Sequence, residues 1–137
     1  MARYVTTISS GLPPEAAFAY MADFSNVPHW DPSVSRAERV DDSTFDLTVR
    51  FGGRDVDLRY RIVEQEPPHR VVLEAPGAGF TSRDTITVSP AGGGSEVHYD
   101  ALLAFHGIRK LLDPVMQRLF KRVGDDAAAG LRRVLNP

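Results

Sequence analysis

The sequence of 137 residues contains no cysteine. This absence excludes disulfide bonds, thiolate nucleophiles and zinc sites with cysteine ligands, and it fits a reducing compartment. A chain of this length can bury a substantial core without cross-links or metal. We therefore expect one domain over residues 1–137, stabilised by ordinary hydrophobic packing.

Long hydrophobic runs and an excess of basic charge are also missing. No segment approaches the roughly 18 apolar residues that a membrane-spanning helix needs. The N-terminal MARYVTTISS lacks the apolar core of a signal peptide. The formal net charge is -2 at pH 7, so the chain has no overall basic field to attract nucleic acid. These absences predict a soluble, cytoplasmic protein with neither stable membrane insertion nor nucleic-acid binding.

Motifs of common cofactor and catalytic sites are absent as well. The glycine runs 52–53 and 92–94 form neither a GxGxxG motif nor a P-loop. The four histidines are dispersed without metal-ligand spacing. No GxSxG sequence indicates a serine hydrolase. We therefore expect no cofactor and no metal.

Alternation of apolar and polar residues predicts strands from residue 3 to 9 and through the middle of the chain. The clearest hairpin joins 44–51 to 54–62, because two consecutive glycines between them suit a tight turn. Its register places Phe45 opposite Tyr60 and makes two charge pairs on the other face. These pairs are Arg50–Asp55 and Asp46–Arg59.

A second hairpin is predicted between residues 80–88 and 96–105, across the loop SPAGGGS. Its register is less defined by the pattern. Placing Arg83 opposite Asp100 would also bring Asp84 beside Tyr99.

Helical spacing appears near both ends of the chain. Residues 12–24 begin with prolines and continue with an alanine-rich run, which predicts a helix with Phe18, Met21 and Phe24 on one face. A long C-terminal helix is predicted with Asp113 as N-cap and Pro114 at its first position. Its apolar stripe contains Met116, Leu119, Phe120, Val123, Ala127, Leu131 and Val134. Glycines and alanines between 124 and 130 leave room for something to lie close to its inner face.

This order of elements predicts an α+β fold. A strongly twisted antiparallel sheet that curls around one long helix is the economical packing, and it leaves a space between sheet and helix.

Three segments, PPEAAFAYMAD, HWDP and EQEPPHRVVLE, resemble the polyketide cyclase/dehydrase-like branch of the START-related (SRPBCC) superfamily. The resemblance covers essentially the whole chain. It implies a helix-grip fold, in which a curved antiparallel β-sheet is wrapped around a long C-terminal helix over an internal cavity. The superfamily includes aromatase/cyclases, lipid and hormone binders and co-chaperone domains. No catalytic motif is shared across that range, so the resemblance implies the fold and leaves the activity open.

Trp30 is the only tryptophan and lies in SNVPHWDP, a loop that Pro28 and Pro32 stiffen and push towards extended geometry. The resemblance implies that this loop lies near the mouth of the cavity. Trp30 is therefore either a fixed lid over the core or part of a gate that contacts ligand. His29 is interpreted first as a surface residue.

Polar residues interrupt the apolar face of segment 80–88. Ser82 and Asp84 share strand parity with Phe80, Ile86 and Val88. A buried carboxylate must be paired, protonated or exposed to water in a cavity, and a raised pKa would suit a general acid or base. The alternatives are that the strand turns Asp84 to solvent, or that a tyrosine simply satisfies it.

Two tyrosines, Tyr60 and Tyr99, are also predicted to point inward. Each could orient a polar group of a hydrophobic ligand, or could be a core tyrosine bonded to backbone or water. The C-terminal segment from residue 109 carries seven basic and three acidic residues. This excess either attracts anionic ligands, lipid headgroups or an acidic partner, or forms a solvated helix face.

The leading hypothesis is binding of a small hydrophobic ligand, such as a lipid, polyketide or aromatic compound. The predicted ligand-binding residues are Trp30, Tyr60, Ser82, Asp84, Tyr99, Met116 and Phe120. One alternative is a cyclase, dehydratase or aromatase in which Asp84 moves protons with a tyrosine or His29. The other is a protein-interaction domain with a filled cavity, although the sequence offers no support for a protein partner.

Overall fold

The computed structural model describes the backbone of residues 1–137 and every side chain except those of Arg109, Leu112 and Asp113. The predicted N-cap role of Asp113 therefore lies outside the described residues. The elements follow the predicted order, with a short 3₁₀ helix (η) before the second strand and another before the last helix. They are β1 (Ala2–Ser10), α1 (Pro14–Ala22), η1 (Phe24–His29), β2 (Val34–Asp41), β3 (Thr44–Phe51), β4 (Arg54–Glu66), β5 (Arg70–Gly77), β6 (Phe80–Ala91), β7 (Gly94–Phe105), η2 (Gly107–Leu112) and α2 (Asp113–Val134).

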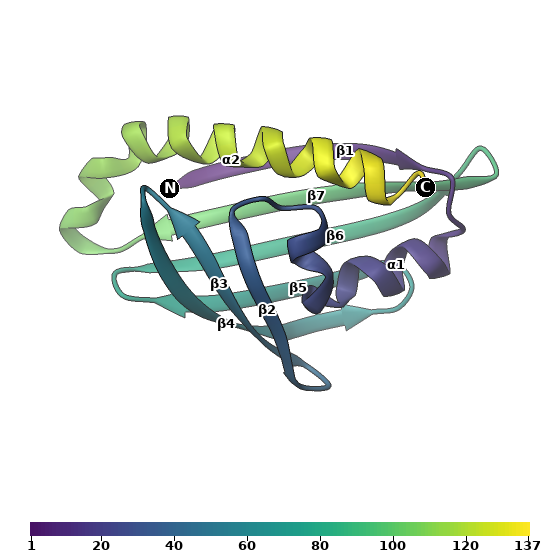
Figure 1. The fold of residues 1–137 in the computed structure, drawn as a ribbon, viewed down its shortest axis with the longest axis horizontal. Helices are drawn as coiled ribbons and strands as arrows, with labels where there is room; N and C mark the ends of the chain where they lie inside the picture. Colours follow the sequence, from purple (N-terminus) through teal and green to yellow (C-terminus); the bar gives the residue numbers. More distant parts are fainter.

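The strands form one antiparallel sheet of seven strands in the order β1-β7-β6-β5-β4-β3-β2. The sheet curls, and α2 lies along β1 and covers one part of the concave side, while α1 and η1 lie near one end (Figure 1). The predicted α+β class, with a curved sheet against a long C-terminal helix, is confirmed.

The hairpin β3–β4 has the predicted register. Phe45 pairs with Tyr60, and Gly52 and Gly53 turn the chain with positive φ angles of 62° and 80°. Such angles favour glycine, because a side chain would clash with the backbone there. Both predicted charge pairs form on the outer face. Arg50 Nε lies 3.1 Å from Asp55 Oδ1, and Arg59 Nε lies 2.7 Å from Asp46 Oδ1.

The register considered for the second hairpin, β6–β7, is wrong by two residues. Arg83 pairs with Leu102, and Asp84 pairs with Ala101 instead of Tyr99. The reason is a second tight turn at Gly92-Gly93, which lets the ladder continue to Ala91 and Gly94, inside the segment expected to be a loop. A shift of two residues preserves the faces, so Asp84 and Tyr99 still share the inner side of the sheet.

The segment before β2 is helical where the sequence predicts extended geometry. Pro28 lies inside the 3₁₀ helix η1, so Val27 is part of a helical turn. The side chain of Asp23 accepts a hydrogen bond from the backbone N–H of Ser25 at 3.1 Å and caps this turn. Phe24, at the start of η1, is buried with Phe18 and Met21 of α1, as their spacing predicts.

Two glycines allow α2 to lie very close to the rest of the molecule. A Cβ atom at Gly124 would lie 2.4 Å from the ring of Tyr4 on β1. A Cβ atom at Gly130 would lie 2.0 Å from the carbonyl oxygen of Trp30. The room that small residues leave on this helix is therefore filled by the protein's own β1 and Trp30 segment.

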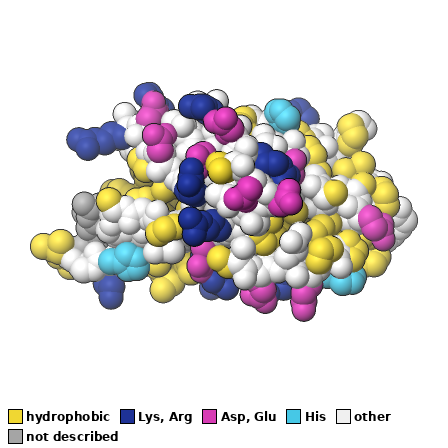
Figure 2. Space-filling view, turned by 90° about the horizontal axis from the view of Figure 1, so that it is seen from below, with side chains coloured by type: hydrophobic (Ala, Val, Ile, Leu, Met, Phe, Trp, Pro, Cys, Tyr) yellow, Lys and Arg dark blue, Asp and Glu magenta, His cyan; other side chains and the backbone are white. Residues whose placement is uncertain are grey.

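The outer surface is mixed in charge. Figure 2 shows basic and acidic side chains intermixed on one face of the molecule. Ion pairs between strand residues include Arg70 with Glu64 and Arg83 with Glu74. In the described part of the chain, no helix has the length and apolar character needed to span a bilayer.

Candidate ligand-binding pocket

A pocket of about 110 Å³ lies between the sheet and α2. Tyr4 on β1, Leu47 on β3 and Phe120 on α2 are among its apolar walls, and η1 closes one side with Phe24 and Val27. Gly124 and Ala127 of α2 line the same space from the side of the helix. Most of the lining is therefore hydrophobic.

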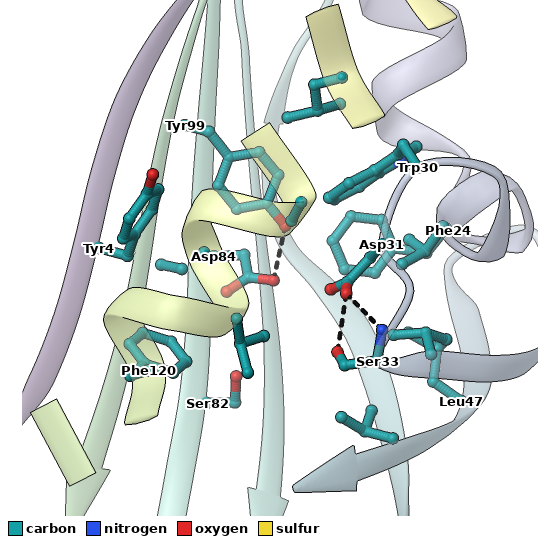
Figure 3. A pocket seen from close by; sticks show the side chains of 18 of the residues that line it. Tyr4, Phe24, Trp30, Asp31, Ser33, Leu47, Ser82, Asp84, Tyr99 and Phe120 are labelled. Atoms are coloured by element: carbon teal, nitrogen blue, oxygen red, sulfur yellow. Dashed lines mark hydrogen bonds between the residues drawn. The ribbon is translucent and has the colours of Figure 1, made fainter. Parts of the chain in front are cut away.

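Asp84 and Tyr99 form the polar centre of the pocket. The Tyr99 hydroxyl donates a hydrogen bond to Asp84 Oδ2 at 2.8 Å, and both side chains are buried (Figure 3). Burial raises the pKa of Asp84 to about 7, since desolvation disfavours the charged carboxylate, and the hydrogen bond from Tyr99 opposes this rise. Asp84 thus places a carboxyl group in a wall that is otherwise mostly apolar.

Tyr60 and Ser82 form a second polar pair in the same wall. The two hydroxyl oxygens lie 2.8 Å apart, and either group can be the donor. The ring of Tyr60 packs edge to face on Phe24, with centroids 5.2 Å apart. Burial, the largest cause, raises the pKa of the Tyr60 hydroxyl, so this group stays neutral.

Asp31 is a pocket residue that the sequence analysis missed. It follows Trp30, and its Oδ1 accepts hydrogen bonds from Ser33 N at 2.9 Å and Ser33 Oγ at 2.7 Å. Its carboxylate and that of Asp84 point toward one another (Figure 3), and burial raises the pKa of Asp31. An aspartate two residues before a serine is a common turn signal, so the pattern predicts the turn but not that the turn faces a cavity.

Trp30 lies at the end of η1 and is 5% exposed. Its ring packs edge to face on Tyr99 with centroids 5.6 Å apart, and it also lines the pocket. Trp30 is thus a packed core residue with one side toward the cavity. This packing fits a fixed lid over the core, and ligand contact by Trp30 stays a prediction.

A second pocket of about 290 Å³ adjoins the first. The two share lining side chains from β3, β4, β6 and α2, including Tyr60, Ser82 and Phe120. The second pocket also includes Met116, Phe80 and Phe105, so it continues the space in an apolar direction. Six of the seven predicted site residues line the first pocket, and Met116 lines only the second.

A family model described as polyketide cyclase/dehydrase and lipid transport matches residues 1–136. The chain belongs to this family. No curated protein sequence matches the chain.

Solved structures with the same fold cover nearly the whole of this family member. A START superfamily protein from Mycobacterium smegmatis is 14% identical, with a TM-score of 0.79 over 98% of this chain and 97% of that chain. A protein from Thermus thermophilus is 18% identical, with a TM-score of 0.78 over 98% and 95%. One half of the di-domain aromatase/cyclase BexL is also similar, at 12% identity and a TM-score of 0.69 over 97% of this chain and 49% of that chain. These similarities establish the START-like helix-grip fold.

Other candidates from the sequence lie outside the pocket of this family member. His29 is absent from the pocket lining, and its backbone carbonyl accepts a hydrogen bond from Arg133 Nη2 at 3.3 Å. This position removes His29 as a proton-transfer partner for Asp84. In the basic C-terminal segment, Lys121 Nζ forms a surface ion pair with Asp125 at 2.9 Å. Among the described residues, no group of three or more histidines and acids could hold a metal ion.

Proposed function

We propose that this family member binds a small hydrophobic molecule in the two adjoining pockets between the sheet and α2. The observation that carries the proposal is the buried pair of Asp84 and Tyr99 on an otherwise apolar wall. A buried carboxylate costs free energy, and it is expected where a polar group must be oriented. The predicted residues Tyr60, Ser82, Asp84 and Tyr99 supply orientation, while Trp30, Met116 and Phe120 supply apolar contact.

The pocket volumes define the size of the ligand. An apolar cavity of about 150 Å³ accommodates one benzene molecule, so the first pocket, at about 110 Å³, holds little more than a small polar end group and its first carbons. The remainder of the ligand would extend into the second pocket of about 290 Å³. Each Å² of apolar surface that it buries contributes roughly 25 cal/mol to binding.

The test is native mass spectrometry of the purified protein, followed by titration of Trp30 fluorescence with a panel of hydrophobic compounds that includes 4-phenylbutan-1-ol. Trp30 is the only tryptophan and its ring lines the pocket, so its emission reports on this site. A co-purified small molecule or a saturable change in emission is the expected result. A folded protein that shows neither would contradict the proposal.

An enzyme of cyclase, dehydratase or aromatase type is a second candidate, because the pKa of Asp84, about 7, suits a general acid or base at neutral pH. Proton transfer would then involve Asp84 and its hydrogen-bonded partner Tyr99. Asp84→Asn would abolish turnover of a cyclising polyketide chain while retaining its binding. Unchanged turnover in this variant would remove Asp84 from the mechanism.

The interaction-domain alternative predicts a filled interior. The two pockets argue against that prediction. Recovery of a specific protein partner, together with failure of the ligand titration, would favour this alternative.

A further inference from the structure

The charges inside the two pockets have one sign. Among the described side chains that line them, none is a lysine, arginine or histidine, and the charged groups are Asp31 and Asp84. They come from different parts of the chain, the turn after η1 and strand β6, and their carboxylates converge on one region of the first pocket (Figure 3). The described lining of the two pockets therefore contains acidic groups and no basic group.

Both carboxylates have an oxygen without a protein donor. Asp84 Oδ2 accepts from Tyr99, whereas Asp84 Oδ1 accepts no hydrogen bond from any described residue. Asp31 Oδ1 accepts twice from Ser33, whereas its Oδ2 has no donor within the described part of the chain. Asp84 is buried and Asp31 is half-buried. Acceptors shielded from water normally have a partner, so two acceptor positions are available to a ligand.

Anionic, neutral and cationic end groups of a ligand would interact differently with these two carboxyl groups. A buried carboxylate or phosphate would lie near two acidic groups without a basic side chain to compensate it, so an anionic end group is disfavoured. A neutral hydroxyl can donate one hydrogen bond and brings no positive charge to the two carboxyl groups. A protonated amine has three donors and a positive charge, and charge-assisted hydrogen bonds are about twice as strong as neutral ones.

We propose, resting on the function proposed above, that the ligand is an amphipathic amine whose protonated amino group lies between Asp31 and Asp84. Its apolar body then extends past Tyr60 and Phe120 into the second pocket, where the lining side chains are uncharged. In this proposal the two aspartates recognise the amino group, and the hydrophobic lining binds the rest of the ligand.

The experiment compares three compounds with the same apolar body: 4-phenylbutylamine, 4-phenylbutan-1-ol and 4-phenylbutanoate. Their dissociation constants are measured at pH 7 by isothermal titration calorimetry and by Trp30 fluorescence. The amine is expected to bind about tenfold more tightly than the alcohol, which corresponds to one charge-assisted hydrogen bond. The acid is expected to bind more weakly than the alcohol.

Variants identify the groups responsible. Asp84→Asn and Asp31→Asn should each reduce the preference for amine over alcohol severalfold while the alcohol still binds. Asp57→Asn is the matched control, because Asp57 is exposed and bonds to Thr48 on the outer side of the hairpin. Its preference for the amine should equal that of the wild type.

The outcomes separate this inference from the proposed function. If the alcohol or the acid binds as tightly as the amine, the preference for an amine is overturned and hydrophobic binding stands. If the amine is preferred but both pocket variants retain the full preference, the assignment to Asp31 and Asp84 is wrong. If no hydrophobic compound binds a folded protein, the proposed function itself fails, and the inference fails with it.

Discussion

At the scale of single residues, Asp84 illustrates how strand parity places a polar side chain inside the fold. Its side chain lies on the same face as Ile86 and Val88, which are buried, so alternation alone places it inside. Its partner Tyr99 is two residues along β7 from Ala101, the residue directly opposite. Long side chains reach such diagonal neighbours, which explains why Asp84 and Tyr99 form a hydrogen bond although they are not directly opposite each other.

The pKa of Asp84 gives a stability prediction. An aspartate in an unfolded chain has a pKa of about 3.9, and the folded value is about 7. The folded state therefore binds more protons between these values, so the free energy of unfolding falls as the pH rises from about 4 to 7. Asp84→Asn removes this loss and should be the more stable protein at pH 8, by up to about 4 kcal/mol. The advantage should shrink toward pH 4.

Urea unfolding of wild type and Asp84→Asn at pH 4.5 and pH 8 checks this prediction. Asp57→Asn serves as a control for the removal of an exposed carboxylate. A stability difference between wild type and Asp84→Asn that stays constant over this pH range would contradict a buried aspartate that is protonated below neutral pH.

The position of Asp31 in the pocket could not be predicted from the sequence pattern. Its sequence neighbours, Trp30, Pro32 and Ser33, identify a turn, and a turn is normally on the surface. Asp31 is half-buried in the pocket because α2, a hundred residues later in the chain, packs against this turn. A contact between residues so far apart in the chain leaves no pattern in the neighbouring sequence from which it could be predicted.

At the scale of elements, the two glycine-glycine turns and the strand periodicity define most of the sheet. The register of β3–β4 follows from its turn and its two charge pairs. For β6–β7 the sequence alone does not show which two residues form the turn, because Pro90 and three consecutive glycines at 92–94 all suit a turn. The sequence also does not predict the 3₁₀ conformation of η1, because a residue before proline prefers extended geometry. In the structure, the packing of Phe24 and Val27 into the core outweighs this preference.

The contact between α2 and the turn at Trp30 makes a prediction about Gly130. Alanine is normally the better helix former by about 1 kcal/mol. At this position, however, its Cβ would lie 2.0 Å from the Trp30 carbonyl oxygen, and backbone cannot yield easily. Gly130→Ala should therefore lower the free energy of unfolding by roughly 1–3 kcal/mol, as overpacking does, and should shift the emission of Trp30.

Ala129→Gly is the matched helix control, because residue 129 is exposed. It should cost about 1 kcal/mol through helix propensity and leave the Trp30 emission unchanged. Chemical denaturation followed by fluorescence reports both quantities. A Gly130→Ala protein as stable as wild type, with unaltered emission, would contradict the close approach of Gly130 to the backbone of Trp30.

At the scale of the whole molecule, the fold supplies a space that its own side chains do not fill. The curved sheet and α2 leave the two pockets between them, and η1 closes one side of the first pocket. In Figure 1, α1 and η1 lie near one end of the sheet. The sheet, the two α-helices and their order were predictable from periodicity and from the family resemblance. The pocket's size and the convergence of its two aspartates were not, because both depend on how far the helix lies from the sheet.

A variant that fills the first pocket tests whether this space is the binding site. Ala101 on β7 lines the pocket directly opposite Asp84 in the ladder, so Ala101→Leu places additional methyl groups in the cavity. The variant should fold and should bind 4-phenylbutan-1-ol at least about tenfold more weakly, because the ligand and leucine compete for the same volume. Val5→Leu, at an exposed position of β1, is the control and should bind as wild type does.

The most direct measurement of the central claim is the titration of Trp30 fluorescence with 4-phenylbutan-1-ol, carried out in parallel on wild type, Ala101→Leu and Val5→Leu. A ligand site between the sheet and α2 predicts a saturable change in wild type and Val5→Leu and a strongly weakened one in Ala101→Leu. Equal titration curves for all three proteins, or no saturable change in any of them, would contradict it.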